Sequence, residues 1–193
     1  MATTITTDDY WSGLYDEGRD YRFITSGELS KILSYADSKL PKACLDVGCG
    51  TGQLLRELFH RGYECVGVDA ATSAIHLANS LTTVLPPQLQ YLHYDIEHDD
   101  ISKLPITAYS LITCKFVYKF IKDKPAFLKK VKSLLAPGGI FVVITPQEID
   151  VAVERRNIAV SDEELSLLGS HFEQIALYKG NEPGGALTYF IGR

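Results

Sequence analysis

The sequence lacks any long apolar run and any basic, apolar leader. A membrane-spanning helix needs about 20 consecutive apolar residues, and no run of that length occurs among the 193 residues. The opening residues, MATTITTDDYW, carry acids where a secretory signal would carry lysine or arginine before an apolar stretch. We therefore expect a cytoplasmic protein without a membrane partner.

Cysteine pairs at metal-ligand spacing are also lacking. The four cysteines, Cys44, Cys49, Cys65 and Cys114, lie in or beside apolar runs, and none belongs to a CxxC pair. Free cysteine packs like a small apolar residue, so we interpret all four as reduced, buried thiols. The five histidines are scattered without ligand spacing, and we expect no bound metal.

A positive charge balance is lacking too. The chain has 19 lysines and arginines against 24 acids, for a net charge of −5, which opposes broad attraction to nucleic acid. One stretch, 115–132, is rich in lysine and has Asp123 as its single acid. It predicts a solvated helix face, or alternatively a local surface that recruits an anionic acceptor.

The length and the apolar pattern predict one α/β domain. With 46% hydrophobic residues the chain can bury one sizeable core, and it is short for two ordinary domains. Short apolar runs alternate with amphipathic stretches as far as Pro146, which is typical of βαβ units on a mostly parallel sheet. The expected strands of this part are 43–47, 64–69, 89–95, 110–114 and 139–145.

The two ends of the chain depart from this alternation. At the amino end, residues 8–25 predict an ordered arm with a short helix, and 26–40 predicts a helix capped by Ser26 and ended by Pro41. At the carboxyl end a helix at 161–172 precedes two strand-like runs around the turn sequence GNEPGG, which predicts an antiparallel hairpin at the sheet edge.

A glycine-rich turn, DVGCGTG at 46–52, joins the first strand to the first helix of the alternating part. Glycine permits backbone angles that other residues avoid, and it lets a ligand approach the main chain closely. The turn therefore predicts a cofactor crevice. The dinucleotide fingerprint GxGxxG is incomplete because its third glycine would fall at Gln53, and no GxxxxGK[ST] run follows a strand.

This turn resembles motif I of the class I S-adenosylmethionine-dependent methyltransferases, (D/E)xGxGxG. The LAPGG run at 135–139 is similar to the turn that precedes the fifth strand of that family. The resemblance covers roughly residues 27–193. It implies a three-layer, Rossmann-like, seven-stranded, mostly parallel sheet with S-adenosylmethionine as cofactor and S-adenosylhomocysteine as product. Residues 1–25 would then be an N-terminal arm and possible lid, and 26–193 the cofactor-binding domain.

Acids at two further strand ends fit an adenosine ligand. Asp69 lies nineteen residues beyond Gly50, and a carboxylate there can accept both ribose hydroxyl protons, although it would also suit NAD. By the resemblance, Asp95 accepts from the adenine amino group and Ile96 packs on the ring. The residues expected to bind the cofactor are Asp46, Gly48, Cys49, Gly50, Thr51, Gly52, Asp69, Ala70, Asp95, Ile96, Lys115, Tyr21 and Arg22.

Methyl transfer is an in-line displacement that needs no protein nucleophile, so positioning can supply much of the rate. Acceptor-side residues should come from the arm and from 115–119, where many relatives have a histidine and this chain has Tyr118 and Lys119. Tyr118 and Tyr15 are therefore the candidate catalytic residues. Arg22 is expected to pair with the methionyl carboxylate, and Trp11 to pack on the core or close the lid.

The leading hypothesis is a methyltransferase with a small-molecule acceptor, because 146–160 leaves little room for a large acceptor-binding insertion. The (D/N)PP(Y/F) motif of nucleobase amine methylation is absent. Three alternatives remain at this point: a methyltransferase acting on tRNA or protein, a non-catalytic module that binds S-adenosylmethionine, and an NAD-linked oxidoreductase. The sequence defines neither the acceptor atom nor the oligomeric state.

Overall fold

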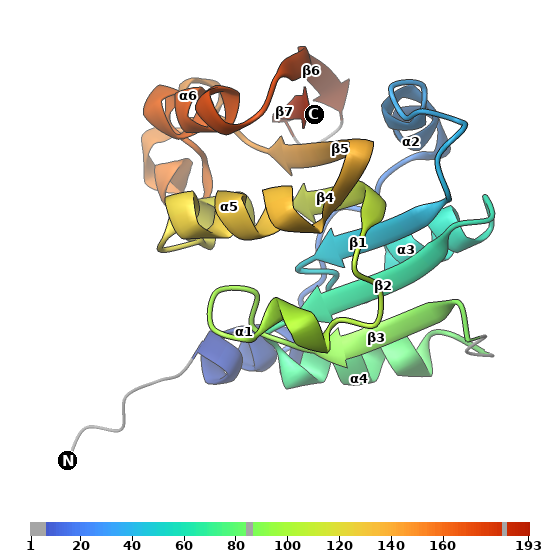
Figure 1. The fold of residues 1–193 in the computed structure, drawn as a ribbon. Helices are drawn as coiled ribbons and strands as arrows, with labels where there is room; N and C mark the ends of the chain where they lie inside the picture. Colours follow the sequence, from blue (N-terminus) through green and yellow to red (C-terminus); the bar gives the residue numbers. More distant parts are fainter. Residues whose placement is uncertain (1–6, 84–86, 183–184) are drawn as a thin grey trace.

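In the part of the chain that the structure describes, seven strands form one sheet in the order β3-β2-β1-β4-β5-β7-β6 (Figure 1). The computed structural model describes residues 7–83, 87–182 and 185–193. The strands are β1 (Ala43–Val47), β2 (Glu64–Asp69), β3 (Leu89–His93), β4 (Tyr109–Lys115), β5 (Leu135–Thr145), β6 (Gln174–Glu182) and β7 (Gly185–Gly192). β1 to β5 are parallel, whereas β7 runs antiparallel to both β5 and β6, so the predicted sheet and edge hairpin are confirmed.

Helices cover both faces of this sheet (Figure 1). The α-helices are α1 (Thr7–Asp16), α2 (Ser26–Leu33), α3 (Gln53–Phe59), α4 (Thr72–Ser80), α5 (Lys124–Leu134) and α6 (Asp162–His171). Short 3-10 turns are η1 (Ile101–Lys103), η2 (Tyr118–Phe120), η3 (Glu148–Asp150) and η4 (Val153–Ile158). α2, α3 and α4 pack on one face of the sheet, and α5 and α6 pack on the other.

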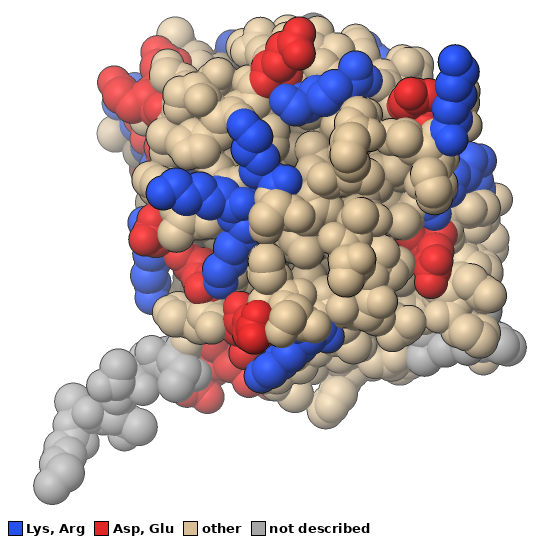
Figure 2. Space-filling model, viewed as in Figure 1, with Lys and Arg blue, Asp and Glu red and all other residues tan. Residues whose placement is uncertain are grey.

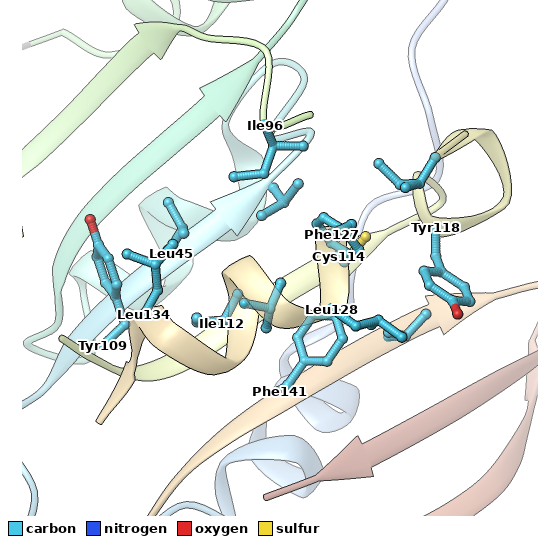
Figure 3. Close-up of a cluster of buried hydrophobic side chains, with 14 of the residues drawn as sticks. Leu45, Ile96, Tyr109, Ile112, Cys114, Tyr118, Phe127, Leu128, Leu134 and Phe141 are labelled. Carbon is cyan, nitrogen blue, oxygen red and sulfur yellow. The ribbon is translucent and has the colours of Figure 1, made fainter. Parts of the chain in front are cut away.

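The core consists of two apolar layers, one on each face of the sheet. Every residue of β1 is buried, as expected for a central parallel strand with helices on both sides. The layer on the α5 side is shown in Figure 3, where Phe127 and Leu128 of α5 meet Phe141 of β5 and Ile112 of β4. Because both layers are continuous, the strand ends are held firmly enough to position a site.

The helix predicted over 26–40 is shorter than its sequence pattern indicates. α2 ends at Leu33 instead of residue 40, and its N-cap is Thr25 instead of Ser26. Thr25 and Glu28 form a capping box, in which each side chain accepts from the other's backbone N–H. Ser34 donates its hydroxyl proton to the Lys31 carbonyl oxygen at 2.7 Å, and such local bonds compete with further helix.

Three of the parallel strands differ in length from their predicted ranges. β3 ends at His93, two residues early, while β4 gains one residue at each end. β5 begins at Leu135 because the LAPGG run already pairs with β4 before it bulges out. Tyr109 lies opposite Leu135 and Leu111 opposite Ile140, and the bulge contains Gly138 at a φ of 80°. The middle of the predicted C-terminal turn, 183–184, lies outside the described residues.

Candidate functional site

A cleft opens at the carboxyl ends of the parallel strands, where the strand order reverses between β1 and β4. Its volume is about 1020 Å³ including the open mouth, and most of its lining is apolar or aromatic. The predicted cofactor residues that line it are Gly48, Cys49, Gly50, Thr51, Asp69, Ala70, Asp95, Ile96, Lys115 and Tyr21. The topology thus brings together residues from four strand ends and the N-terminal arm.

The glycine turn forms the floor of the cleft. Gly48 and Gly50 have φ angles of 68° and 53°, which residues with a Cβ rarely adopt. A Cβ at Gly50 would lie 2.7 Å from the Tyr15 hydroxyl, so the arm closes directly onto this glycine. Gly52 does not line the cleft, because its Cα faces the ring of Tyr91 on β3 and a Cβ there would lie 2.5 Å from the ring.

Asp69, the last residue of β2, stands beside this turn. Its side chain is 9% exposed, and its two carboxylate oxygens accept from Gly50 N–H at 2.8 Å and Ala71 N–H at 2.9 Å. Burial raises the pKa of Asp69, against the lowering effect of these two hydrogen bonds. An ionised carboxylate has about four acceptor positions, so two remain for hydroxyl groups of a ligand.

The loop after β3 forms a second polar edge of the cleft. Asp95 accepts from Glu97 N–H at 2.9 Å and from His98 Nδ1 at 2.8 Å, and these contacts lower its pKa against the opposing effect of burial, which is the largest single influence. Ile96 is buried and lines the cleft next to it. Lys130 of α5 holds the loop from behind, where its ammonium donates to the carbonyl oxygens of Ile96 at 2.9 Å and Glu97 at 2.7 Å.

Asp46, which was predicted as a cofactor residue, is buried and is not among the residues that line the cleft. Its side chain is 2% exposed and accepts from the Thr113 hydroxyl at 2.7 Å. Burial raises the pKa of Asp46 to about 6, although Thr113 and Lys115 oppose the shift. Through its bond with Thr113, this acid joins the carboxyl-terminal parts of β1 and β4.

Arg22 also differs from its prediction. Its guanidinium donates to Glu28 Oε1 at 2.6 Å, and Tyr189 of β7 donates its hydroxyl proton to the same carboxylate. Arg22 therefore faces α2 and β7 instead of the cleft. Its carbonyl oxygen accepts from the ammonium of Lys115 at 3.1 Å. Burial lowers the pKa of Lys115, while the nearby Asp46 and Asp20 raise it.

Of the two candidate catalytic tyrosines, only Tyr15 lines the cleft. Tyr118 is 0% exposed, packs beside Phe127 and donates its hydroxyl proton to the Glu164 carbonyl oxygen at 3.2 Å (Figure 3). The structure thus does not bring Tyr118 to the cleft, because the 3-10 turn η2 directs its ring into the core. Burial raises the pKa of Tyr15 far above its usual range, so its hydroxyl keeps its proton at neutral pH.

Trp11 and Phe116 line the cleft and belong to the arm and to the segment 115–119 that were expected there, whereas Phe120 and Asp20 were not predicted from the sequence. Trp11 of α1 and Phe120 of η2 meet edge to face across the cleft, with ring centroids 4.8 Å apart. Phe116, directly after β4, has a φ of 62°, which is unusual for a bulky residue and often marks a functional position. Asp20 lines the cleft next to Tyr21. No motif marks these positions, and only their place in the arm or after β4 could have drawn attention to them.

Three lysines of the lysine-rich segment are held by partners within the fold. Lys119 pairs with Glu148 at 3.3 Å and Glu164 at 3.1 Å, and Lys124 pairs with Glu164 at 2.9 Å. Lys132 donates to the His171 carbonyl oxygen at 3.1 Å. Figure 2 accordingly shows lysines and arginines interspersed with acids on the side that carries α5.

Among the described residues, no helix is both long and apolar enough to cross a bilayer.

Comparison with known sequences gives a family and a set of relatives. A family model described as a methyltransferase domain matches residues 15–177. The mitochondrial ubiquinone biosynthesis O-methyltransferase of Schizosaccharomyces pombe is 34% identical over 107 residues, which are 54% of this chain and 38% of that relative. The chain thus spans well under two thirds of this curated relative.

Two solved structures share the fold. TehB from Haemophilus influenzae superposes with a TM-score of 0.68 at 17% identity, covering 96% of this chain and 66% of TehB. The plantazolicin methyltransferase BpumL, solved in complex with SAH, superposes with a TM-score of 0.64 at 14% identity, covering 85% of this chain and 80% of BpumL. At these identities the likeness shows the fold alone.

Proposed function

Since this chain belongs to the methyltransferase domain family, we propose that it binds S-adenosylmethionine in the cleft and transfers the methyl group to a small-molecule acceptor. The match to the family model runs from the arm to β6 and includes every residue of the glycine turn. BpumL, which shares the fold, was solved with the product SAH, and this supports the same cofactor here.

The pairing of Asp69 with the glycine turn is the observation that carries this function. The Gly50 N–H donates to the Asp69 carboxylate at 2.8 Å, so the turn and the acid form one rigid unit. A Cβ at Gly48 would lie 2.1 Å from a methyl carbon of Val117, so only glycine leaves the turn in place. These residues fit an adenosine: Asp69 would hold the ribose hydroxyls, Asp95 the adenine amino group, and Ile96 would pack on the ring.

The rest of the cleft serves to position the reactants. The bound cofactor supplies a sulfonium methyl group, which a nucleophilic atom of the acceptor can take by in-line displacement. The chain must then hold the acceptor in line and exclude water, which gives effective molarities that lower the barrier by several kcal/mol. Trp11 and Phe120 close one side of the cleft by their ring contact, and Tyr15 covers the glycine turn.

The lining also favours a small, partly apolar acceptor. Phe23, Phe116 and Phe120 contribute to the lining, and pockets of this apolar kind bind small molecules. The curated relative acts, by its name, in ubiquinone biosynthesis, which supports a small-molecule acceptor here. A tRNA or protein acceptor finds no support in the lysine-rich segment, because Lys119, Lys124 and Lys132 are bound within the fold. Cytoplasmic location stays a prediction.

Calorimetric titration of the purified protein with S-adenosylmethionine, S-adenosylhomocysteine and NAD tests the cofactor. We expect the first two to bind and NAD not to bind. The substitution Asp69→Ala should lower the affinity for S-adenosylmethionine and S-adenosylhomocysteine by at least about tenfold, because it removes charge-assisted hydrogen bonds to the ribose. Glu64→Ala, at the exposed opposite end of β2, is the matched control and should bind as the wild type does.

Binding of NAD alone, or an Asp69→Ala protein with unchanged affinity, would overturn this function. Once the cofactor binds, release of S-adenosylhomocysteine with candidate acceptors tests the transfer itself. Turnover with small hydroxylated or amino compounds is expected. Turnover that requires added tRNA or protein would show that the acceptor is a polymer and not a small molecule.

A further inference from the structure

One carboxylate outside the cleft lining receives donors from three separate parts of the chain. Glu28, in the first turn of α2, accepts from the Arg22 guanidinium at 2.6 Å and from the backbone N–H of Thr25 at 2.8 Å. The hydroxyl of Tyr189 on β7 donates to the same carboxylate. Burial tends to raise the pKa of Glu28, but these donors outweigh it and lower the pKa to about 2. The carboxylate is therefore ionised at neutral pH.

The ring of Tyr189 is itself fixed within the domain. Tyr189 is 1% exposed and stacks on Tyr178 of β6, with ring centroids 4.9 Å apart and 5° between the ring planes. Tyr178 in turn stacks on Tyr35, which follows α2, and the ammonium of Lys31 lies 3.6 Å from its ring centroid. Because the Tyr189 ring is buried and stacked, Tyr189 and Glu28 form a fixed point at which the arm can be anchored.

The arm passes this fixed point with alternate residues held by the domain. Ile24 is 4% exposed, and its backbone N–H and carbonyl oxygen each bond to the side-chain amide of Gln53 at 3.3 Å. Tyr21 and Phe23, which flank Arg22, are 37% and 52% exposed, and both line the cleft. Successive side chains of an extended chain point to opposite sides, so holding Arg22 and Ile24 directs Tyr21 and Phe23 toward the mouth of the cleft.

The same anchor also reaches a charged group of the cleft. The carbonyl oxygen of Arg22 accepts from the ammonium of Lys115 at 3.1 Å, and Lys115 lines the cleft. A carbonyl oxygen moves with its own residue. The pairing of the Arg22 guanidinium with Glu28 therefore also determines where the acceptor for Lys115 lies.

We propose that Glu28 is a positioning residue, which acts through Arg22 to hold the arm across the cleft with Tyr21 and Phe23 at its mouth. Resting on the proposed function, Glu28 is required for tight binding of the adenosyl ligand although it does not line the cleft. Tyr189 fixes the Glu28 carboxylate, so the carboxyl-terminal hairpin contributes to a site that none of its described residues line.

Backbone amide exchange without ligand tests the anchor. Glu28→Gln keeps an acceptor for Thr25 N–H, so α2 stays capped, but it removes the charge that holds Arg22. We expect amide exchange at 20–24 to become about tenfold faster, while exchange in α2 and β7 stays as in the wild type. A role confined to the stability of α2 would instead accelerate exchange in α2. Glu163→Gln, the same change at an exposed position in the first turn of α6, is the matched control and should alter none of these rates.

A double-mutant cycle tests whether Glu28 acts through Arg22. Arg22→Met removes the guanidinium, so it should accelerate exchange at 20–24 as Glu28→Gln does. The double variant should exchange no faster than Arg22→Met alone, because the two substitutions break the same link. The affinity for S-adenosylhomocysteine, measured by calorimetry, should fall several-fold in each single variant and no further in the double variant.

Three results would overturn the positioning role: unchanged exchange at 20–24 in Glu28→Gln, an unchanged affinity for S-adenosylhomocysteine, or effects of the two substitutions that add in the double variant. Failure of the wild type to bind S-adenosylhomocysteine would instead overturn the proposed function, and the exchange rates measured without ligand would still test the anchor. If Glu28→Gln does not fold, Arg22→Met tests the same link at a side chain that is 24% exposed, and unchanged exchange there contradicts it.

Discussion

Among single residues, Asp46 shows how a carboxylate inside a sheet couples stability to pH. It lies in β1 between Gly67 of β2 and Thr113 of β4, and the Thr113 hydroxyl is its hydrogen-bond donor. One neutral donor compensates only part of the cost of removing an ionised carboxylate from water. Burial accordingly raises the pKa of Asp46 to about 6, from an ordinary value of 3.8.

Asp46 should therefore make the protein less stable as the pH rises. The pKa of Asp46 is higher in the folded state than in the unfolded state. Its contribution to the free energy of unfolding is therefore fully present below pH 3.8 and is lost as the pH rises through about 6. An asparagine side chain carries no charge at any of these pH values. The free energy of unfolding of Asp46→Asn should therefore rise relative to that of the wild type by about 2 kcal/mol between pH 4 and pH 7. Urea unfolding at several pH values measures this difference.

Asp69→Asn serves as a comparison in the same experiment, because that acid is also buried but is held by two backbone N–H donors. A difference between Asp46→Asn and the wild type that stays constant from pH 4 to pH 7 would contradict the raised pKa.

At the scale of elements, α5 supports the loop after β3 that borders the cleft. Lys130 reaches over the edge of the core and donates to the carbonyl oxygens of Ile96, Glu97 and Asp99 at 2.9, 2.7 and 3.3 Å. The loop after β3 has no helix of its own beyond η1, so this ammonium satisfies carbonyl groups that regular structure would otherwise pair. The loop that would hold adenine is therefore positioned by a helix that does not touch the cleft.

Lys130→Met should remove this support while keeping the length of the side chain. We expect a loss of about 1–2 kcal/mol in free energy of unfolding and a several-fold weaker affinity for S-adenosylmethionine, because three carbonyl groups lose a charged donor. Lys129→Met on the exposed neighbouring position should change neither quantity. Amide hydrogen exchange should rise at 95–99 in Lys130→Met alone, and exchange unchanged there would refute the role of α5.

At the scale of the whole molecule, the arm is joined to the domain along one side of the cleft. Asp8 of α1 accepts from the backbone N–H and the hydroxyl of Thr72, both at 2.8 Å, and so caps the amino end of α4. The Ser12 hydroxyl accepts from Ser73 N–H at 3.2 Å. These contacts place Trp11 and Tyr15, which lie on the same helix, in the lining of the cleft.

Asp8→Ala should release α1 from α4 and leave the sheet intact. Amide exchange at 7–16 should then increase, and S-adenosylmethionine should bind more weakly because Trp11 and Tyr15 no longer cover the cleft. Added cofactor should increase the protection of 7–16 in the wild type and in Asp16→Ala, the control on the same helix. Unchanged exchange at 7–16 in Asp8→Ala would show that the apolar contacts of α1 suffice.

The succession of the elements along the chain and the place of the cleft follow from the amino-acid sequence alone. Buried parallel strands are continuous apolar runs, so β1 and β2 were predicted with their observed bounds. The alternation of strands with helices indicates a parallel sheet, and the glycine turn must stand where the first strand of the sheet ends. All of these are local properties of the chain, readable within a few neighbouring residues.

Only the tertiary structure decided which side chains reach the cleft. Tyr118 packs into the core, Arg22 is drawn to Glu28 and Tyr189, and Asp46 is enclosed by strands that are distant in sequence. Asp20, without any motif, meets Thr51 across thirty-one positions of the chain. Such directions depend on partners brought together by folding, and the free energy of burial, pairing and charge is defined only once those partners are in place.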